Sequence, residues 1–225
     1  MTAQALPPTW PMYRSLVGVG MLCGLLIAVV FQGTRPVIER NRAEALERAI
    51  FAVLPAATER ATFAVNDDGE FVAAVDAAGR RLHAGYAADG ELVGFAIEGA
   101  GMGYADTITV LYGYSPQQQA IIGFRVLTSK ETPGLGDKIE TDPGFLENFV
   151  ALDVTLDASG QALRHPVVTV KQGKKTEPWQ IDGVTGATIS SKAIGEILAG
   201  SAGHWLPLIN AQLDTFVKAG ADDES

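Results

Sequence analysis

The sequence predicts an α+β domain carried behind a single N-terminal transmembrane helix. An apolar run without any charge covers Ser15–Phe31, short strand-like runs separated by turn signals fill Ala61–Ser129, and helical patterns follow toward the C-terminus. Runs of strands with helices appended are typical of α+β domains. We therefore expect one mixed, largely antiparallel sheet with flanking helices.

The apolar run is long enough to cross a bilayer. At the helical rise it spans about 25 Å, close to the ~30 Å hydrocarbon core. Trp10 and Tyr13 precede it, where interfacial aromatic residues belong. No small-x-small cleavage site follows the run, which favours an uncleaved anchor over a signal peptide. We assign residues 1–14 to a short N-terminal segment and 15–34 to a transmembrane helix.

The residues after the span predict a helical stalk and then a domain. Apolar residues at Val37, Ile38, Leu46 and Ile50 follow helical spacing, and Pro55 marks the end. We assign residues 35–55 to the stalk and 56–225 to the folded domain.

The charges next to the span do not settle its orientation. The arginines that follow it outnumber Arg14 before it, which favours a cytoplasmic C-terminal domain under the positive-inside rule. They are Arg35, Arg40, Arg42 and Arg48. On charge alone we assign no topology.

Composition excludes several classes of function. The net charge is −9, and the only basic run is "KQGKK", Lys171–Lys175, which we interpret as a turn between strands. A nucleic-acid ligand is therefore excluded. Cys23 is the only cysteine, so cysteine-ligated iron–sulfur clusters and CxxC pairs are excluded too. The three histidines are far apart in sequence, and we expect no metal site. Any electron carrier must be organic.

The strands of the domain are expected to pair mostly with their sequence neighbours, in antiparallel fashion. Turn signals such as Asp89-Gly90 separate them. A short helix around Phe145–Phe149, a strand at "HPVVTV" and a last helix over Trp205–Val217 complete the pattern. The strand-like runs are "FVAAV", "RLHAGYA", "ELVGFAIE", "TITVLYGY" and "AIIGFRVLTS".

Two glycine-containing stretches are candidates for a ligand site. "GAGMGYAD", Gly99–Asp106, predicts a loop whose backbone can approach a ligand, but it lacks Rossmann spacing. "KETPGLGDKIE", Lys130–Glu140, fits a type II turn centred on Pro133-Gly134. Its four polar side chains exceed what a turn needs. They are Glu131, Thr132, Asp137 and Lys138.

The stretch "DGVTGATISSKAIGEIL", Asp182–Leu198, predicts an anion site at the start of a helix. Several hydroxyl side chains can act as N-cap acceptors, although a single cap uses only one of them. Small residues around Thr188 leave room for a phosphate at a helix N-terminus. The P-loop spacing is absent. The hydroxyl residues are Thr185, Thr188, Ser190 and Ser191, and the small ones are Gly183, Gly186 and Ala187.

The last two motifs together resemble the FMN-binding domain family. "DGVTGATIS" matches the pattern Asp-x-x-Ser/Thr-Gly-Ala-Thr for covalent flavin attachment, and "ETPGLGDKI" resembles the second signature of the electron-transport members. Those members are the G subunit of the Rnf complex, to which this chain is more similar, and the C subunit of the sodium-pumping NADH:quinone oxidoreductase.

The resemblance implies which residues hold the flavin. A flavin transferase would join FMN from FAD to Thr188 as a phosphoester and release AMP. Asp182, Thr185, Gly186 and Ala187 would complete the motif, with Asp182 recognised by the transferase or its metal. Glu131, Thr132, Leu135 and Gly136 would lie against the flavin ring, with Gly103 and Tyr104 on its other side.

The resemblance also implies a function, that of a one-flavin electron relay in an ion-translocating ferredoxin:NAD+ oxidoreductase. Its partners would be the A, B, C, D and E subunits of the Rnf complex, and hydride transfer would occur elsewhere. The domain would lie on the periplasmic side of a bacterial inner membrane. Two alternatives stay open: the C subunit of the quinone oxidoreductase, and a membrane-tethered module that binds a phosphorylated ligand without redox function.

Overall fold

The computed structural model describes residues 10–66, 69–73 and 81–221, and the chain divides into two compact units, Met1–Ala45 and Leu46–Ser225. The described part of the first unit is helical. Helix α1, Trp10–Val53, continues without a break past Pro36 into the first residues of the second unit. It begins before the predicted span and ends two residues before Pro55. It is also the one described helix long and apolar enough to cross a membrane.

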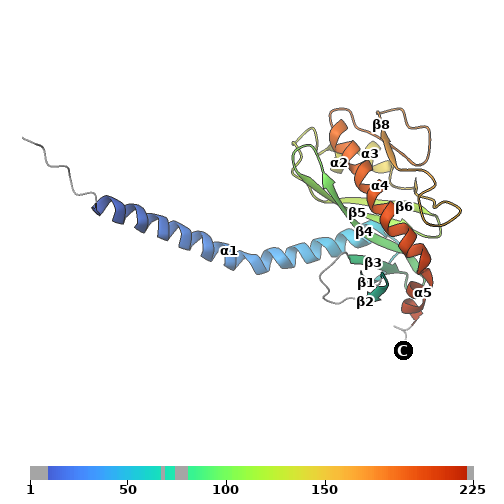
Figure 1. The fold of residues 1–225 in the computed structure, drawn as a ribbon, viewed down its shortest axis with the longest axis horizontal. Coiled ribbons are helices and arrows are strands. Elements are labelled where there is room, and N and C mark those ends of the chain that lie inside the picture. The colour runs from blue at the N-terminus through green and yellow to red at the C-terminus, as the bar shows by residue number, and fades with distance from the viewer. Residues whose placement is uncertain (1–9, 67–68, 74–80, 222–225) are drawn as a thin grey trace, which may run out of the picture. The chain divides into compact units, whose positions relative to one another are not determined.

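The second unit contains a seven-stranded antiparallel sheet, which confirms the predicted α+β class (Figure 1). The strand order is β2-β1-β3-β4-β5-β6-β7. The strands are β1 (Glu59–Val65), β2 (Phe71–Ala73), β3 (Arg81–Tyr86), β4 (Leu92–Met102), β5 (Thr107–Ser115), β6 (Ala120–Thr128) and β7 (Leu152–Asp153). A separate parallel pair joins β8 (Val168–Val170) to β9 (Gln180–Asp182).

Helices α2 (Lys138–Thr141) and α3 (Pro143–Glu147) follow β6, while α4 (Thr188–Ala211) and α5 (Leu213–Ala221) end the described chain. Helix α4 packs on β4 and β8, and Figure 1 shows it crossing the sheet. Its buried residues recur at helical spacing, from Ile194 through Leu198 to Trp205 and Ile209, so one face enters the core.

The two faces of the sheet have separate cores. On one face an aromatic cluster forms around Phe216 of α5, whose ring centroid lies 4.9 Å from Phe63 and 4.7 Å from Phe95. On the other face the end of α1 buries Ile50 and Val53, and Leu54 directly after it, against Ala96 and Leu111. Burial of such side chains contributes roughly 1.5–3 kcal/mol each.

Glycines on four adjacent strands admit the end of α1. Gly85 pairs with Gly94, and Gly113 pairs with Gly123. A Cβ at Gly113 would lie 2.1 Å from the carbonyl oxygen of Val53, and one at Gly123 would lie 2.4 Å from it. Only a surface without side chains allows this approach, so these glycines determine where the helix end packs.

Several sequence predictions differ from the structure. Residues 99–102, predicted as a loop, form the end of β4, because Gly99–Met102 pair with Thr107–Val110 of β5. The strand predicted at "HPVVTV" is reduced to Val168–Val170, and the strand predicted at 71–75 is described only as far as Ala73. The turn predicted at Lys171–Lys175 does lie between strands.

The C-terminal helices also differ from the prediction. A single helix runs from Thr188 through Pro207 to Ala211, and α5 follows it, whereas we expected a separate helix over Trp205–Val217. The apolar residues around Trp205 continue the buried face of α4, so burial extends the first helix past the proline.

Replacing Gly113 should destabilise the domain. In Gly113→Ala the new Cβ meets the Val53 carbonyl oxygen, and we expect a loss of about 1–3 kcal/mol from the free energy of unfolding, as for other overpacked sites. Urea denaturation of the detergent-solubilised chain measures it. Gly203→Ala is the control, because its Cβ would meet nothing within 4 Å and it lies within a helix. Equal stability of the two variants would contradict the packing argument.

Candidate functional site

The three stretches identified in the sequence as candidates for a ligand site meet at one open cavity of ≈ 310 Å³ beside the start of α4. They are Gly99–Asp106, Lys130–Glu140 and Asp182–Leu198. The hairpin turn between β4 and β5 supplies one side, the segment after β6 another, and the first turn of α4 the third. The lining residues are Tyr104, Glu131, Thr132, Leu135, Gly136, Gly186, Ala187, Thr188, Ile189 and Ser190.

The turn into α4 leaves backbone donors free at the cavity. Gly186 has φ +91°, a conformation that favours glycine. Ala187 occupies the N-cap position and has no side-chain hydrogen bond to offer. Among the described residues no acceptor pairs with the N–H groups of Thr188, Ile189 or Ser190. These donors and the helix dipole favour an anion here.

None of the hydroxyl side chains that could have capped α4 does so, since Ala187 is at the N-cap position. Buried Ser190 instead donates to Glu131 at 2.5 Å, and buried Ser191 accepts from the N–H of Val184 at 3.2 Å. Thr188 is exposed, and its hydroxyl has no hydrogen-bond partner in the part of the chain that the structure describes. The buried hydroxyls thus hold the turn, while the Thr188 hydroxyl is left without a partner among the described residues.

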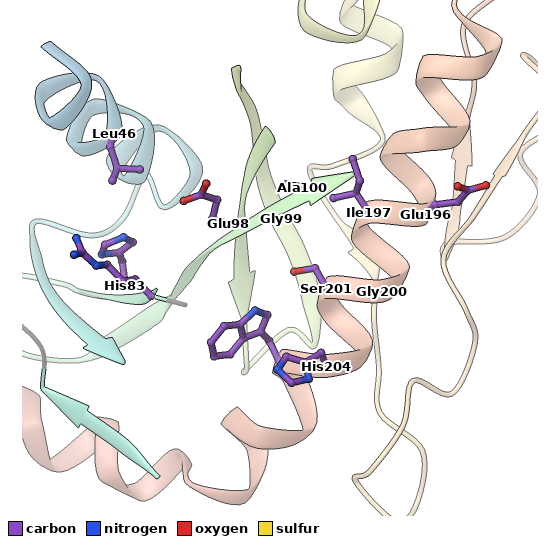
Figure 2. A pocket seen from close by; sticks show the side chains of 12 residues that line it. Leu46, His83, Glu98, Gly99, Ala100, Glu196, Ile197, Gly200, Ser201 and His204 are labelled. Atoms are coloured by element: carbon purple, nitrogen blue, oxygen red, sulfur yellow. The ribbon is translucent and has the colours of Figure 1, made fainter. Parts of the chain in front are cut away.

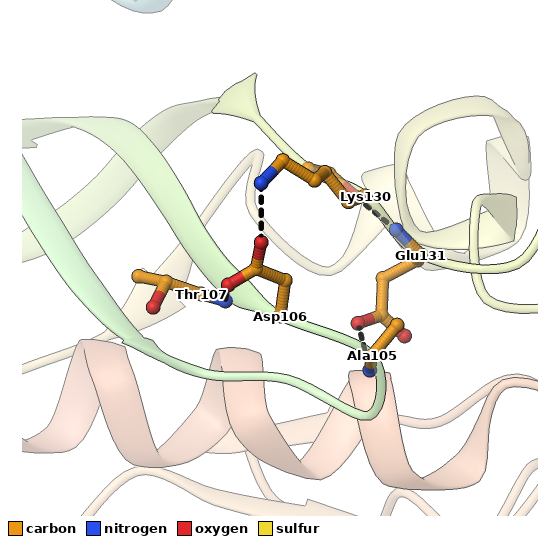
Figure 3. A network of polar contacts seen from close by, with 6 residues as sticks. Ala105, Asp106, Thr107, Lys130 and Glu131 are labelled. Atoms are coloured by element: carbon orange, nitrogen blue, oxygen red, sulfur yellow. Dashed lines mark hydrogen bonds and ion pairs between the residues drawn. The ribbon is translucent and has the colours of Figure 1, made fainter. Parts of the chain in front are cut away.

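Buried Glu131 ties the three segments together. Its Oε1 accepts hydrogen bonds from the backbone N–H groups of Tyr104 (2.9 Å) and Ala105 (3.0 Å), and its Oε2 accepts the Ser190 hydroxyl. Figure 3 shows the carboxylate directed at Ala105, with Lys130 paired to Asp106 beside it. One side chain therefore fixes the hairpin turn, its own loop and the first turn of α4.

Two glycines make room for this carboxylate. A Cβ at Gly103 would lie 2.5 Å from Oε1 of Glu131, and a Cβ at Gly136 would lie 2.7 Å from Oε2. Both distances are shorter than real Cβ contacts. Packing against Glu131 thus explains the second glycine of "GMG" and the second glycine of "GLG". The first glycine of "GLG", Gly134, has the positive φ (+77°) that the predicted type II turn at Pro133-Gly134 requires.

Glu131 is ionised despite its burial. Burial raises its pKa, but hydrogen bonds from the Ser190 hydroxyl and from the backbone of Ala105, Tyr104 and Asp106 outweigh that effect and lower the pKa below the ordinary value. The floor of the cavity therefore carries a fixed negative charge.

The walls of the cavity are apolar and exposed. Tyr104 is 65% exposed, Leu135 51% and Ile189 55%, so three large hydrophobic side chains from three segments surround one opening. Exposed apolar groups that converge in this way are typical of ligand sites. Sequence reasoning missed Ile189, although its place directly after Thr188 on the first helical turn could have indicated it.

Three of the predicted site residues are not among those that line the cavity. The Asp182 carboxylate accepts from the N–H groups of Gly173 (2.9 Å) and Lys174 (3.2 Å), which holds the basic turn against the loop. The Thr185 carbonyl oxygen accepts from Lys138 Nζ at 3.4 Å. Gly103 only packs against Glu131, as described above. Lys138 was noted in the sequence as a polar residue, but its contact with this turn was not predicted.

A larger cavity of ≈ 720 Å³ lies farther along α4 (Figure 2). Its lining includes Gly99 and Ala100 of the first stretch and Glu196 and Ile197 near the end of the third, but no residue of "ETPGLGDKI" or "DGVTGATIS". Glu98 and Ala100 of β4, His83 of β3, and Ser201 and His204 of α4 are among its lining residues. Burial lowers the pKa of His83 to about 4, with Arg60 and Arg81 adding to the effect, so this imidazole is neutral. Size alone therefore does not identify the functional site.

The chemistry of the smaller cavity suits a ligand with an apolar part and an anionic part. The apolar walls match the first, and the free N–H groups beside Thr188 match the second. Among the described residues no cluster of three or more His, Cys, Asp or Glu side chains could hold a metal ion.

Comparison with protein families shows a match to the FMN-binding domain over residues 103–200. The match thus begins at the hairpin turn of the cavity and ends within α4. The chain is also similar to the G subunit of an ion-translocating oxidoreductase complex of Methanosarcina acetivorans, with 30% identity over 187 residues that cover 82% of this chain and 87% of that protein. A protein of the same description from Shewanella piezotolerans is 31% identical over 81% of this chain and 85% of its own length.

Solved structures share the fold. NqrC of Shewanella oneidensis superposes with a TM-score of 0.56 at 17% identity, covering 82% of this chain and 99% of that one. The C subunit of the Na(+)-translocating NADH-quinone reductase of Parabacteroides distasonis gives a TM-score of 0.57 at 22% identity, covering 75% and 94%.

The charge of Glu131 should appear in the pH dependence of stability. Because its folded pKa is lowered, its contribution is fully present above the ordinary value of 4.5 and is lost as pH falls through the folded value. At pH 7, Glu131→Gln should cost about 1.5–3 kcal/mol, since Gln cannot accept all three hydrogen bonds. That difference should shrink as the pH falls below 4.5.

Urea denaturation at a series of pH values measures this difference. Glu140→Gln, at an exposed position in the same segment, is the matched control and should leave stability unchanged at each pH. A difference between wild type and Glu131→Gln that stays constant with pH would contradict the ionised state.

Proposed function

The chain belongs to the family formed by the G subunits of ion-translocating oxidoreductase complexes, and from that premise we propose that it is a covalent FMN electron carrier. The FMN would be joined by its phosphate to Thr188. The observation that carries the proposal is the cavity, where the two flavin motifs and the β4–β5 turn meet around an exposed, unpartnered Thr188 hydroxyl.

The residues at the cavity fit FMN. Tyr104, Leu135 and Ile189 would hold the flat, largely apolar ring, and the absence of a Cβ at Gly186 leaves space beside Thr188. The free N–H groups at the start of α4 would receive the phosphate. Each part of the cofactor therefore has a matching part of the site.

Thr188 suits a phosphoester because its hydroxyl is exposed and stands at the positive end of a 24-residue helix. A flavin transferase would make this bond from FAD, with AMP as the leaving group. Asp182 would contribute indirectly, since its hydrogen bonds to the 173–174 turn hold the loop in the shape that the transferase recognises.

Bound FMN supplies the transfer of one or two electrons. The protein contributes position and charge. Glu131 is the only carboxylate that lines the described cavity, and both of its oxygens already accept hydrogen bonds. Glu131 would therefore act on the flavin as a fixed negative charge.

In this proposal the partners are the A, B, C, D and E subunits of an Rnf complex. A relative from Acetobacterium woodii, 35% identical over 108 residues that cover 47% of this chain and 46% of that protein, is described as the G subunit of a Na(+)-translocating ferredoxin:NAD(+) oxidoreductase complex. The solved structures of quinone-reductase C subunits are similar in fold at lower identity, so that role is the less favoured candidate.

The membrane arrangement follows from α1. We propose that residues 15–34 span the bilayer, that residues 35–55 form the stalk and that residues 56–225 carry the flavin on the periplasmic side. A covalent bond is most useful there, because no free FMN pool would replace lost cofactor. The arginines after the span favour the opposite orientation, and a direct test is needed.

Thr188→Val should abolish covalent flavin without loss of the fold, because the Thr188 side chain is exposed and unpartnered. Intact mass and in-gel flavin fluorescence of the denatured chain, purified from a host with a flavin transferase, measure it. Thr128→Val is the control, since it removes an exposed hydroxyl on β6, outside both motifs, and should keep the flavin. Covalent FMN on the Thr188→Val variant would refute the assignment.

The proposed periplasmic location of the domain predicts the activity of two reporter fusions. Alkaline phosphatase fused after Ser225 should be active and a green fluorescent protein fusion at the same point dark, since each folds properly on only one side of the bacterial inner membrane. The reverse pattern would place the domain in the cytoplasm.

A further inference from the structure

We infer that Lys138 is the cation that binds the phosphate of FMN and thereby distinguishes FMN from riboflavin. The inference rests on the proposed flavin site and adds a residue to it. Lys138 begins α2, three residues after Leu135 of the apolar wall. One segment would therefore contact the ring at Leu135 and the phosphate at Lys138.

The ammonium group of Lys138 lies at the turn that precedes Thr188, residues 185–187. Lys138 Nζ donates to the carbonyl oxygen of Thr185 at 3.4 Å. It also lies 3.5 Å from the place where a Cβ of Gly186 would stand, and Leu135 Cδ2 lies 3.6 Å from the same place. The ammonium and the ring wall thus flank the same open side of Gly186, two residues before Thr188.

The Lys138 ammonium group has hydrogen-bond donors that the described residues do not use. Its ammonium makes this one long hydrogen bond, and within the described ranges no carboxylate forms an ion pair with it. Lys130, in contrast, is paired with Asp106, and Lys175 donates to Asn148. An ammonium group has three donors, so two remain for phosphate oxygens.

Glu131 and Asp182 do not compete for the ammonium. Glu131 is buried and already accepts from Ser190, Tyr104 and Ala105. The Asp182 carboxylate is held by two backbone N–H groups of the 173–174 turn. A phosphate at the start of α4 would therefore meet free N–H donors on the helix side and a free cation on the other side.

The test measures flavin binding in the full-length, detergent-solubilised chain carrying Thr188→Val, so that no covalent bond forms. FMN and riboflavin differ only in the phosphate, and quenching of their fluorescence reports both dissociation constants. Adding Lys138→Gln should weaken FMN binding about tenfold and leave riboflavin binding unchanged, because one charge-assisted contact is lost. Lys138→Arg should retain most of the FMN affinity.

Lys174→Gln is the matched control. The Lys174 side chain is exposed on the turn whose backbone N–H groups donate to Asp182. The substitution therefore removes one positive charge of the same kind without removing a side-chain contact to residues 185–188. Salt screens such a charge, and the effect on FMN should stay under about twofold.

The outcomes separate this inference from the proposed function. Equal weakening of FMN and riboflavin by Lys138→Gln, an unchanged FMN affinity, or no measurable FMN binding to the Thr188→Val parent would each overturn the role of Lys138. The covalent assignment is judged independently by the mass of the chain with Thr188 intact, where an unmodified mass would overturn it whatever Lys138 does.

Discussion

The site depends on one buried carboxylate, Glu131. Its hydrogen bonds from Ser190, Tyr104 and Ala105 connect a hairpin turn, a loop and a helix that are far apart in sequence. A buried anion is costly unless it is fully paired, so the three segments hold the arrangement that pairs it. The cavity is the space left between segments fixed in this way.

Glycines in the sheet make this arrangement possible, because they allow a helix to approach the strands closely. A Cβ at Gly101 would lie 2.6 Å from Ile197 Cγ1 and one at Gly99 2.9 Å from Ile197 Cγ2, so α4 lies close to β4. That close approach brings the start of α4 to the level of the β4–β5 turn, where Glu131 joins them. On the other face Gly113 and Gly123 admit the end of α1 in the same manner. Both helices are thus positioned by glycines, whose lack of a side chain lets the helices approach the sheet.

The sequence predicted the fold class, the order of the central strands and the segments that form the cavity. Periodicity and turn residues are local signals, and β4, β5 and β6 pair with their sequence neighbours, so local signals suffice there. Local signals could not predict that Ser190 donates to Glu131, because those residues are 59 positions apart. They also made Ser190 and Ser191 look like helix caps, whereas tertiary contacts use both hydroxyls elsewhere. Gly99 and Gly101 were interpreted as loop residues for the same reason, since only the contact with Ile197 explains glycine within a strand.

The shape of the cavity bears on why a covalent bond would be needed at all. An open site of ≈ 310 Å³ with half-exposed walls can cover only part of a flavin ring, so contacts alone would hold the cofactor weakly. A deeper cavity would hold it better but would keep electron-transfer partners away from the ring. The proposed bond at Thr188 would remove this conflict, because a tethered ring would stay at high effective concentration beside its site however shallow the site is. Exposure of the ring and retention of the cofactor would then depend on different groups, the first on the apolar walls and the second on one hydroxyl at the start of α4.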